Sequence, residues 1–180
     1  MPPDASLRES VAEAIADFGD EVVHGAGFWH FENEVIDTSP KGFADTVRVL
    51  RGYADPARPR DDGMVPCDYL WITDDDPTRV IGFMSFRHEL NDFLLEQGGH
   101  IGYSIRPSRR REGHASRALA LALDRAAELG IDRALVTCDE DNEPSRRTIE
   151  RNGGVYEDTR KGKRRYWIDT ASRRAPHSGR

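Results

Sequence analysis

The residues whose types and spacing best suit chemistry lie in one arginine-rich turn, residues 105–117, which reads Ile-Arg-Pro-Ser-Arg-Arg-Arg-Glu-Gly-His-Ala-Ser-Arg. The turn joins a strand-like segment to an Ala/Leu-rich helical segment. The first amide N–H groups of a helix have no partners inside the helix and carry partial positive charge, so they favour an anion. Gly113 and Ala115 leave space for a phosphate to approach the backbone, and the three consecutive arginines offer charge-assisted hydrogen bonds. The turn therefore predicts a site for the phosphates of a nucleotide cofactor.

Two common phosphate-binding patterns are missing from the chain. A P-loop requires Gly-x-x-x-x-Gly-Lys followed by Ser or Thr, and a dinucleotide fold requires Gly-x-Gly-x-x-Gly; neither string is present. Instead, Arg110-x-x-Gly113-x-Ala115, preceded by Gly-Tyr-Ser-Ile-Arg-Pro, resembles the acyl-CoA-binding signature of the GNAT superfamily of N-acetyltransferases. A second segment, from Asn142-Glu-Pro-Ser to Asn-Gly-Gly at 152–154, is similar to the family's second cofactor-contacting segment. The resemblance covers about residues 67–169.

The resemblance implies acetyl-CoA as the co-substrate and no metal ion. Asn142 is also explained as a simple helix N-cap, but the matching Asn of the family contacts the pantetheine arm or the water beside it. The residues that we expect to contact the cofactor are Ile105, Arg110, Arg111, Glu112, Gly113, His114, Ala115, Ser116, Asn142 and Ser145.

A general base is expected because a primary amine is mostly protonated at neutral pH and attacks only as the neutral species. His100 is the first candidate, since several branches of the family have a Glu at the matching place, two residues before Gly102. Alternation along a strand puts His100, Gly102 and Ser104 on one face, toward the expected cleft. The alternative for His100 is a hydrogen-bonded structural role, and Glu96 and Glu89 are second candidates for the base. A backbone N–H near Ser104 or Ile105 is expected to polarise the thioester carbonyl.

The proton donor for the leaving thiolate is not given by the resemblance. Many family members place a Tyr seven residues after the Asn of the second segment, where this chain has Ile149. Tyr166 and Cys138 are available, but nothing in their spacing selects either of them. A thiol pKa of about 8.5 also lets the thiolate leave unaided. Tyr103 alternates to the opposite face of its strand and is expected in the core.

The elements that position these groups follow from hydrophobic periodicity and turn residues. Ser6 with Glu9 predicts a capped first helix, and Ser39 before Pro40 caps a second. A strand, helix and strand around the turn imply a right-handed crossover with parallel pairing. We expect helices over 6–18, 40–53, 115–129 and 143–151, and strands over 67–73, 79–87, 100–106, 131–138, 155–159 and 165–168.

These elements predict an α/β fold: a mixed, mostly antiparallel central sheet of about six strands flanked by about four helices, with a strand–turn–helix–strand unit that binds CoA. The resemblance implies the same architecture. One departure is that the family usually begins with a strand before its first helix, whereas residues 1–5 are too short to supply a good one.

Length and charge indicate one domain over residues 1–170 and a small, basic, disordered tail over 171–180. The net charge of −6 hides an asymmetry, because residues 105–117 carry five Arg against one Glu, whereas residues 55–96 carry ten acidic residues against four Arg. This asymmetry fits an anionic cofactor on one side and a cationic amine on the other. The acidic net charge and the absence of aromatic residues among the clustered arginines argue against nucleic-acid binding.

Cysteine usage and hydropathy indicate the compartment. Cys67 and Cys138 lie far apart and match no metal-ligand spacing, so we expect them to be buried and structural. Neither a signal-peptide pattern nor an apolar run of membrane-spanning length is present. A cytoplasmic protein without a membrane partner is expected.

The function that the sequence predicts is an N-acetyltransferase in which a primary amine of a small molecule or peptide attacks acetyl-CoA directly. The alternative is a non-catalytic acyl-CoA-binding or sensing module, which Ile149 favours. The loops 21–37 and 88–97 are expected to shape the acceptor pocket. The aromatic residues Phe28, Trp29 and Phe31 are expected in that pocket, in the seam of a possible homodimer, or in the core.

Overall fold

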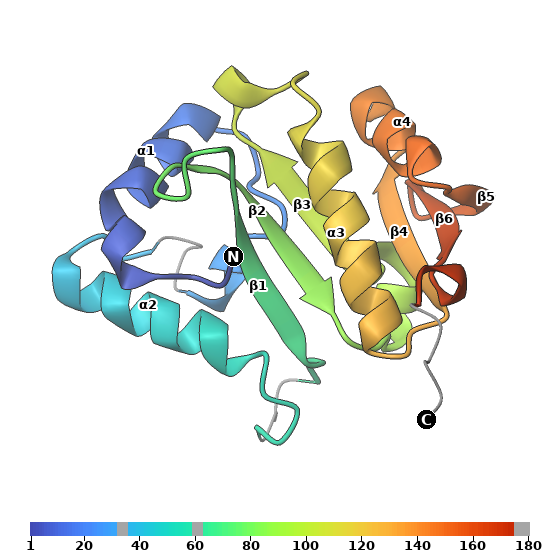
Figure 1. Cartoon of the computed structure of the whole chain (residues 1–180), viewed down its shortest axis with the longest axis horizontal. Coiled ribbons are helices and arrows are strands. Elements are labelled where there is room, and N and C mark those ends of the chain that lie inside the picture. The colour runs from blue at the N-terminus through green and yellow to red at the C-terminus, as the bar shows by residue number, and fades with distance from the viewer. Residues whose placement is uncertain (32–35, 59–62, 175–180) are drawn as a thin grey trace, which may run out of the picture.

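The described part of the chain folds around one six-stranded sheet with the order β1-β2-β3-β4-β6-β5 (Figure 1). The computed structural model describes residues 1–31, 36–58 and 63–174. The strands are β1 (Cys67–Thr73), β2 (Val80–Arg87), β3 (Ile101–Ile105), β4 (Arg133–Asp139), β5 (Val155–Arg160) and β6 (Lys163–Asp169). The main helices are α1 (Arg8–Phe18), α2 (Pro40–Gly52), α3 (His114–Glu128) and α4 (Glu143–Arg151). The predicted α/β fold with a mostly antiparallel sheet is confirmed.

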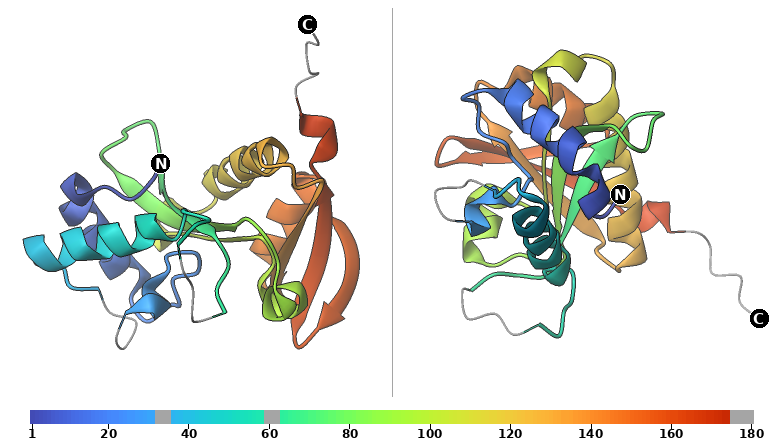
Figure 2. Two further views of the ribbon diagram at one scale, coloured as in Figure 1. Left: turned by 90° about the horizontal axis from the view of Figure 1, so that it is seen from below. Right: turned by 90° about the vertical axis from the view of Figure 1, so that its left-hand side faces the viewer.

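The helices cover both faces of the sheet. Phe83 of β2 packs with residues of α1 and α2, whereas its neighbour Met84 packs with residues of α3 and α4. Because successive side chains of a strand point to opposite faces, the two helix pairs lie on opposite sides. Figure 2 shows α3 across the sheet from α1 and α2. Two apolar layers therefore hold the sheet between them.

The sheet consists of two antiparallel halves that are joined loosely. Strands β1, β2 and β3 pair in antiparallel register, as do β4, β6 and β5. The parallel contact between β3 and β4 is described by a single pair, Ile101 with Val136. Beyond this pair the two strands diverge, and α3 makes the crossover between them. The divergence opens a gap in the middle of the sheet.

Helix ends follow the predicted signals in some places and not in others. The Ser39 hydroxyl caps α2 by accepting the Gly42 N–H at 3.2 Å, as predicted. The prediction that Ser6 caps α1 is wrong, because Ser6 itself donates to the Asp4 carboxylate and Leu7 precedes the helix without a side-chain cap. Asp4 instead organises a short 3-10 turn, Ala5–Leu7, before α1.

The two ends of the described chain both pack on the fold. Met1 accepts a hydrogen bond from the Trp71 N–H at 2.8 Å and donates one to the Trp71 carbonyl at 2.9 Å. A single residue therefore pairs with the outer edge of β1, where the family was expected to have a strand. Near the other end, Ala171–Arg173 form a 3-10 turn, and Arg174 pairs with Asp132. The tail predicted from residue 171 is thus ordered up to residue 174, and residues 175–180 lie outside the described residues.

Candidate functional site

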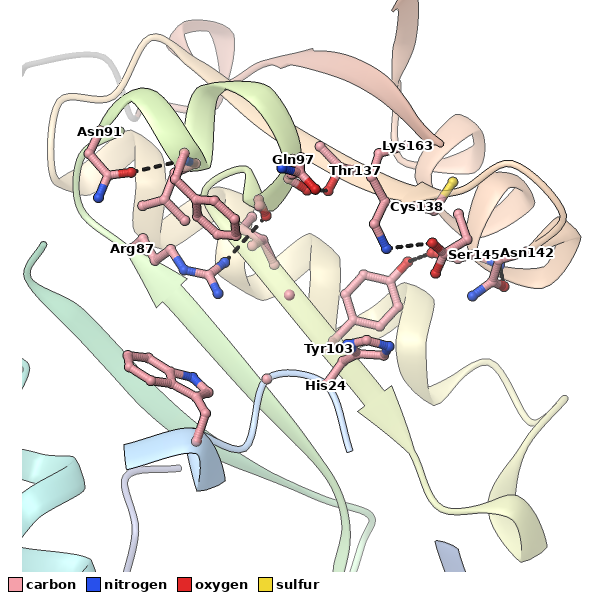
Figure 3. A pocket seen from close by; sticks show the side chains of 18 of the residues that line it. His24, Arg87, Asn91, Gln97, Tyr103, Thr137, Cys138, Asn142, Ser145 and Lys163 are labelled. Carbon is pink, nitrogen blue, oxygen red and sulfur yellow. Dashed lines mark hydrogen bonds and ion pairs between the residues drawn. The ribbon is translucent and has the colours of Figure 1, made fainter. Parts of the chain in front are cut away.

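A pocket of about 500 Å³ lies where β3 and β4 diverge. Its walls come from both strands, from the N-terminus of α4, from the loop after α1 and from the short helical turn Leu94–Gly98 (Figure 3). The loops 21–37 and 88–97, predicted to shape the acceptor pocket, both contribute lining residues. The polar residues among the lining are His24, Arg87, Asn91, Gln97, Tyr103, Thr137, Asp139, Asn142, Ser145 and Lys163.

The arginine-rich turn presents a row of unpaired backbone donors. Among the described residues, the N–H groups of residues 111–116 have no hydrogen-bond partner, and helix α3 begins at His114 without a side-chain cap. Arg111 and Gly113 adopt left-handed conformations with φ of 66° and 86°, which aim successive N–H groups into one concave turn. Such an array at a helix N-terminus fits the pyrophosphate of a CoA-type molecule. The residues of this turn therefore fit the predicted cofactor.

The arginine side chains of the turn have different partners. Arg109 pairs with Asp74 and Glu112, and Arg110 donates from Nε to the Ile105 carbonyl at 2.9 Å while its terminal nitrogens pair with Glu21. Arg110 thus braces the end of β3 against the loop after α1.

The side chain of Arg111 pairs with no acidic group among the described residues, so it is available to a phosphate. The neighbouring side chains of Glu112 and His114 bond to each other at 3.0 Å. For these two residues the available phosphate donors are their backbone N–H groups. Most of the affinity at this turn is therefore expected from the backbone.

The second predicted cofactor segment lies against the gap. Asn142 caps α4, because its Oδ1 accepts the Ser145 N–H at 3.0 Å, and both residues line the pocket. Ser145 also bonds through its hydroxyl to Tyr103 at 3.1 Å. At the other end of α4, the Asn152 side chain donates to Ser116 and so ties α4 to the first turn of α3. The two predicted cofactor segments are therefore brought together along one side of the gap.

Strand β3 turns toward the gap N–H groups that have no strand partner among the described residues. The Arg87 N–H donates to the His100 carbonyl, and the Arg106 N–H donates to the Ile81 carbonyl, so the even-numbered positions of β3 bond to β2. By alternation, the N–H groups of Tyr103 and Ile105 face β4, which has diverged. Of the two donors predicted from the sequence, Ile105 has this orientation and Ser104 does not.

Comparison with known proteins assigns the family. A family model described as an acetyltransferase (GNAT) domain matches residues 12–155. The chain belongs to the GNAT acetyltransferase family. The match begins inside α1, well before the residue at which the sequence resemblance was placed. Family membership confirms the predicted acetyltransferase.

Solved acetyltransferases share this fold at low sequence identity. RimJ of Mycobacterium smegmatis, in complex with CoA-disulfide, is 20% identical with a TM-score of 0.62, over 93% of this chain and 83% of that one. The ribosomal-protein-S5-alanine acetyltransferase of Vibrio fischeri is 14% identical with a TM-score of 0.62, over 97% and 94% of the chains. The microcin C7 self-immunity acetyltransferase MccE, in complex with acetyl-CoA and AMP, is 15% identical with a TM-score of 0.58, over 94% and 90%. No curated protein matches this GNAT acetyltransferase in sequence.

The side chains first predicted to be catalytic in this acetyltransferase lie outside the pocket lining. His100 is 6% exposed, and its Nδ1 accepts the Leu135 N–H at 2.9 Å, which matches the structural alternative. Burial lowers the pKa of His100 to about 4. Glu96 pairs with Arg160 at 2.6 Å, and the Ser104 hydroxyl donates to the His24 carbonyl at 2.7 Å. Alternation failed for His100 because that residue precedes β3 and turns toward β4 instead.

His24 is a site residue that the sequence did not single out. It lines the pocket from the loop after α1, beside the ring of Tyr103 (Figure 3). Ser104 holds its carbonyl, and Gly25, with φ of 81°, brings the loop onto the backbone of β3. Partial burial, and then the nearby Lys163 ammonium, lower the pKa of His24. The one sequence signal was the prediction that this loop shapes the pocket.

Tyr103 is the second missed residue. Its ring packs on the core as predicted, but its hydroxyl reaches the pocket and Ser145 of α4. Burial raises the pKa of Tyr103 to about 12, so the hydroxyl remains protonated at neutral pH. The position expected for a family tyrosine holds Ile149, which is buried in the core. A phenol is therefore present at the N-terminal end of α4, supplied by β3 and not by the helix.

The cysteines and the aromatic residues of the loop after α1 divide between the core and the pocket. Cys67 and Cys138 are free and buried, as predicted, although Cys138 also lines the pocket. Trp29 lines the pocket, whereas Phe28 packs on Phe83 with ring centroids 5.5 Å apart. In the part of the chain that the structure describes, no three His, Cys, Asp or Glu residues are placed to hold a metal. No helix within the described ranges is long and apolar enough to span a bilayer.

Proposed function

We propose that this acetyltransferase transfers the acetyl group of acetyl-CoA to a primary amine of a small molecule or peptide by direct attack of the amine. The observation that carries the proposal is the composition of the pocket. Asn142 and Ser145, expected beside the cofactor, form one wall, and His24 faces them from the other. A proton acceptor and the second cofactor segment thus share one cavity.

The residues of the pocket can account for each proton. The amine nitrogen forms a bond to the acetyl carbonyl carbon, the carbon–sulfur bond breaks, and its electron pair leaves with sulfur. His24, which its lowered pKa keeps neutral at neutral pH, accepts the proton that the amine loses. Tyr103, whose phenol is protonated at neutral pH and reaches the pocket, donates a proton to the thiolate. The N–H groups of Tyr103 and Ile105 that face the gap are placed to stabilise charge on the carbonyl oxygen.

The alternative function, a non-catalytic acyl-CoA sensor, drew its support from Ile149. That support weakens because Tyr103 supplies a phenol to the pocket from β3. Turnover separates the two functions directly, since a sensor binds acetyl-CoA without releasing CoA thiol in the presence of amines.

The test combines acetyl-CoA binding by calorimetry with thiol release across a panel of amines. Substituting His24→Gln should lower kcat by about 10²–10⁴-fold, the usual contribution of a general base, and leave acetyl-CoA affinity unchanged. The rate of the unmodified protein should rise with pH as His24 loses its proton, and His24→Gln should lose that rise. Val22→Gln is the matched control, since Val22 is exposed in the same loop and does not line the pocket.

The outcomes distinguish an acetyltransferase that uses His24 as its base from a non-catalytic sensor. Wild-type kcat and pH profile in His24→Gln would remove His24 as the base. Acetyl-CoA binding without release of CoA thiol in the presence of any amine would favour the sensor, and failure to bind acetyl-CoA would refute both functions.

Location, partners and oligomeric state are unchanged from the sequence predictions. A cytoplasmic location, and the absence of membrane and nucleic-acid partners, stay predictions that fractionation and binding assays can check. A homodimer also stays a prediction, which light scattering would test.

A further inference from the structure

Arg87, the last residue of β2, places a guanidinium in the pocket without an acidic partner. Its NH1 donates to the carbonyls of Gly98 and Gly99, each at 3.3 Å. Among the described residues, no carboxylate lies within ion-pair distance of Arg87, although most other described arginines have one. The side chain is half-buried. Because a partly desolvated charge is costly when unpaired, the pocket favours an anion at this point.

The carbonyls of Gly98 and Gly99 also fix the direction of the guanidinium. They engage one terminal nitrogen, and the second terminal nitrogen and Nε have no partner within the described ranges. Figure 3 shows the guanidinium pointing into the cavity. A fork of two N–H donors matches the two oxygens of a carboxylate.

The pocket has two chemically different ends. Figure 3 shows His24, Tyr103 and Ser145 together near β4 and α4, with Arg87 and Asn91 across the cavity. The side chain of Asn91 is engaged within the protein, since it donates to the Gly63 carbonyl and accepts from the Leu94 N–H. Among the described lining residues, Arg87 is therefore the charged group at the end remote from the proposed reaction. The apolar residues along the same cavity are Trp29, Met64, Phe93 and Leu94.

The charges of the lining also oppose a polycationic acceptor. The one acidic side chain among the described lining residues is Asp139, and Lys163 pairs with it. Arg87 then leaves the described part of the lining with a positive balance. The acidic segment 55–96, expected from the sequence to attract a cationic amine, thus contributes Arg87 to this cavity and none of its described carboxylates.

We propose that the acceptor is an amino carboxylate with an apolar portion: its amine lies near His24 and its carboxylate is bound by Arg87. This inference rests on the proposed acetyl transfer and adds the substrate class. Free amino acids with apolar side chains have this chemistry, and so does a short peptide whose C-terminal carboxylate reaches the same point. Polyamines and aminoglycosides lack it.

The test compares each amino acid with its amide, in which a neutral group replaces the carboxylate. L-Leucine and L-phenylalanine are measured against leucinamide and phenylalaninamide by thiol release, beside Leu-Leu and Phe-Leu dipeptides and spermidine. We expect the unmodified protein to prefer each acid over its amide by about 10- to 100-fold in kcat/KM, as for a hydrogen-bonded charge pair. In Arg87→Gln this ratio should fall to about 1, and Arg87→Lys should recover part of it.

Controls separate recognition from folding. Arg48→Gln is the matched control, because Arg48 is an exposed arginine of α2 outside the pocket. Its acid-to-amide ratio should equal that of the unmodified protein. Arg87→Gln should keep the acetyl-CoA affinity of the unmodified protein, since Arg87 lies outside the arginine-rich turn.

Equal use of acids and amides by the unmodified protein would overturn the inference while leaving acetyl transfer intact, and so would a preference for spermidine. If no amine is acetylated, the proposed function fails separately. Calorimetry of the same acids and amides in the presence of CoA then decides the inference: acid-selective binding that Arg87→Gln loses supports it, and its absence refutes it. The dipeptide arm tells whether the carboxylate comes from a free amino acid or a peptide end.

Discussion

Replacing Gly25 with alanine tests the contact that places His24. Gly25 has φ of 81°, and a Cβ at this position would lie 2.6 Å from the Gly102 carbonyl oxygen and 3.0 Å from the Met84 Cα. Both neighbours are backbone atoms of the central sheet, so they cannot rotate away. The left-handed conformation costs a residue with a side chain about 1–2 kcal/mol, and overpacking against a rigid neighbour costs about 1–3 kcal/mol. We expect Gly25→Ala to lower the free energy of unfolding by about 2–5 kcal/mol.

Urea denaturation measures this change, and Gly162→Ala isolates its steric part. Gly162 has φ of 76° in the turn between β5 and β6, and a Cβ there would meet nothing within 4 Å. This control should cost about 1–2 kcal/mol, from conformation alone. A Gly25→Ala variant no less stable than Gly162→Ala would refute the close approach of the loop to β3.

Activity provides a second readout of the same substitution. If the loop moves outward to relieve the contact, His24 leaves its place beside Tyr103, and thiol release should fall while acetyl-CoA affinity at the distant turn is retained. Gly162→Ala should keep full activity, since residues 161 and 162 do not line the pocket.

Three further predictions concern buried and capping polar groups. The folded-state pKa of His100 is lowered to about 4, so on acidification the unfolded chain takes up a proton before the folded protein does. The free energy of unfolding should therefore fall by up to about 3 kcal/mol as the pH drops from about 6.5 to 4. Urea denaturation at each pH should show a smaller fall for His100→Gln. Arg165, 1% exposed and paired with Glu157 and Asp158, should cost about 2–4 kcal/mol on substitution by Met, and stability within 0.5 kcal/mol of the parent in urea would contradict this. Asn142→Ala should remove about 1 kcal/mol of stability with the cap of α4, while Asn142→Asp should retain most of it, as thermal unfolding would record.

The sequence predicts the elements well where local signals are strong. The strands after the first two helices, the Ser39 cap and the crossover helix all follow from periodicity and end signals that act within a few residues. Gly130, with φ of 79°, ends α3 as its position after the Leu/Ala pattern indicated. The arginine-rich turn was found for the same reason, because its glycine and helix start are contiguous.

The catalytic side chains depend instead on contacts between distant segments. His100 was chosen by strand alternation, which does not apply one residue before the strand begins. His24 reaches the site only because Gly25 packs on β3. This contact, like the hydrogen bond from Ser104 to the His24 carbonyl, joins residues about eighty positions apart in the sequence. Arg110 was predicted to bind phosphate because the sequence does not show that its side chain pairs with Glu21, which is equally remote. Local pattern cannot report such pairs.

The divergence of β3 from β4 makes β3 a strand with one bonded edge and one open edge. The amides of Gly102 and Ser104 face β2, whereas those of Tyr103 and Ile105 face the gap. Hydrogen–deuterium exchange along this strand should therefore alternate between slow and fast from one residue to the next. Two neighbouring amides then serve as an internal gauge of occupancy: whatever fills the gap slows the fast pair and leaves the slow pair unchanged.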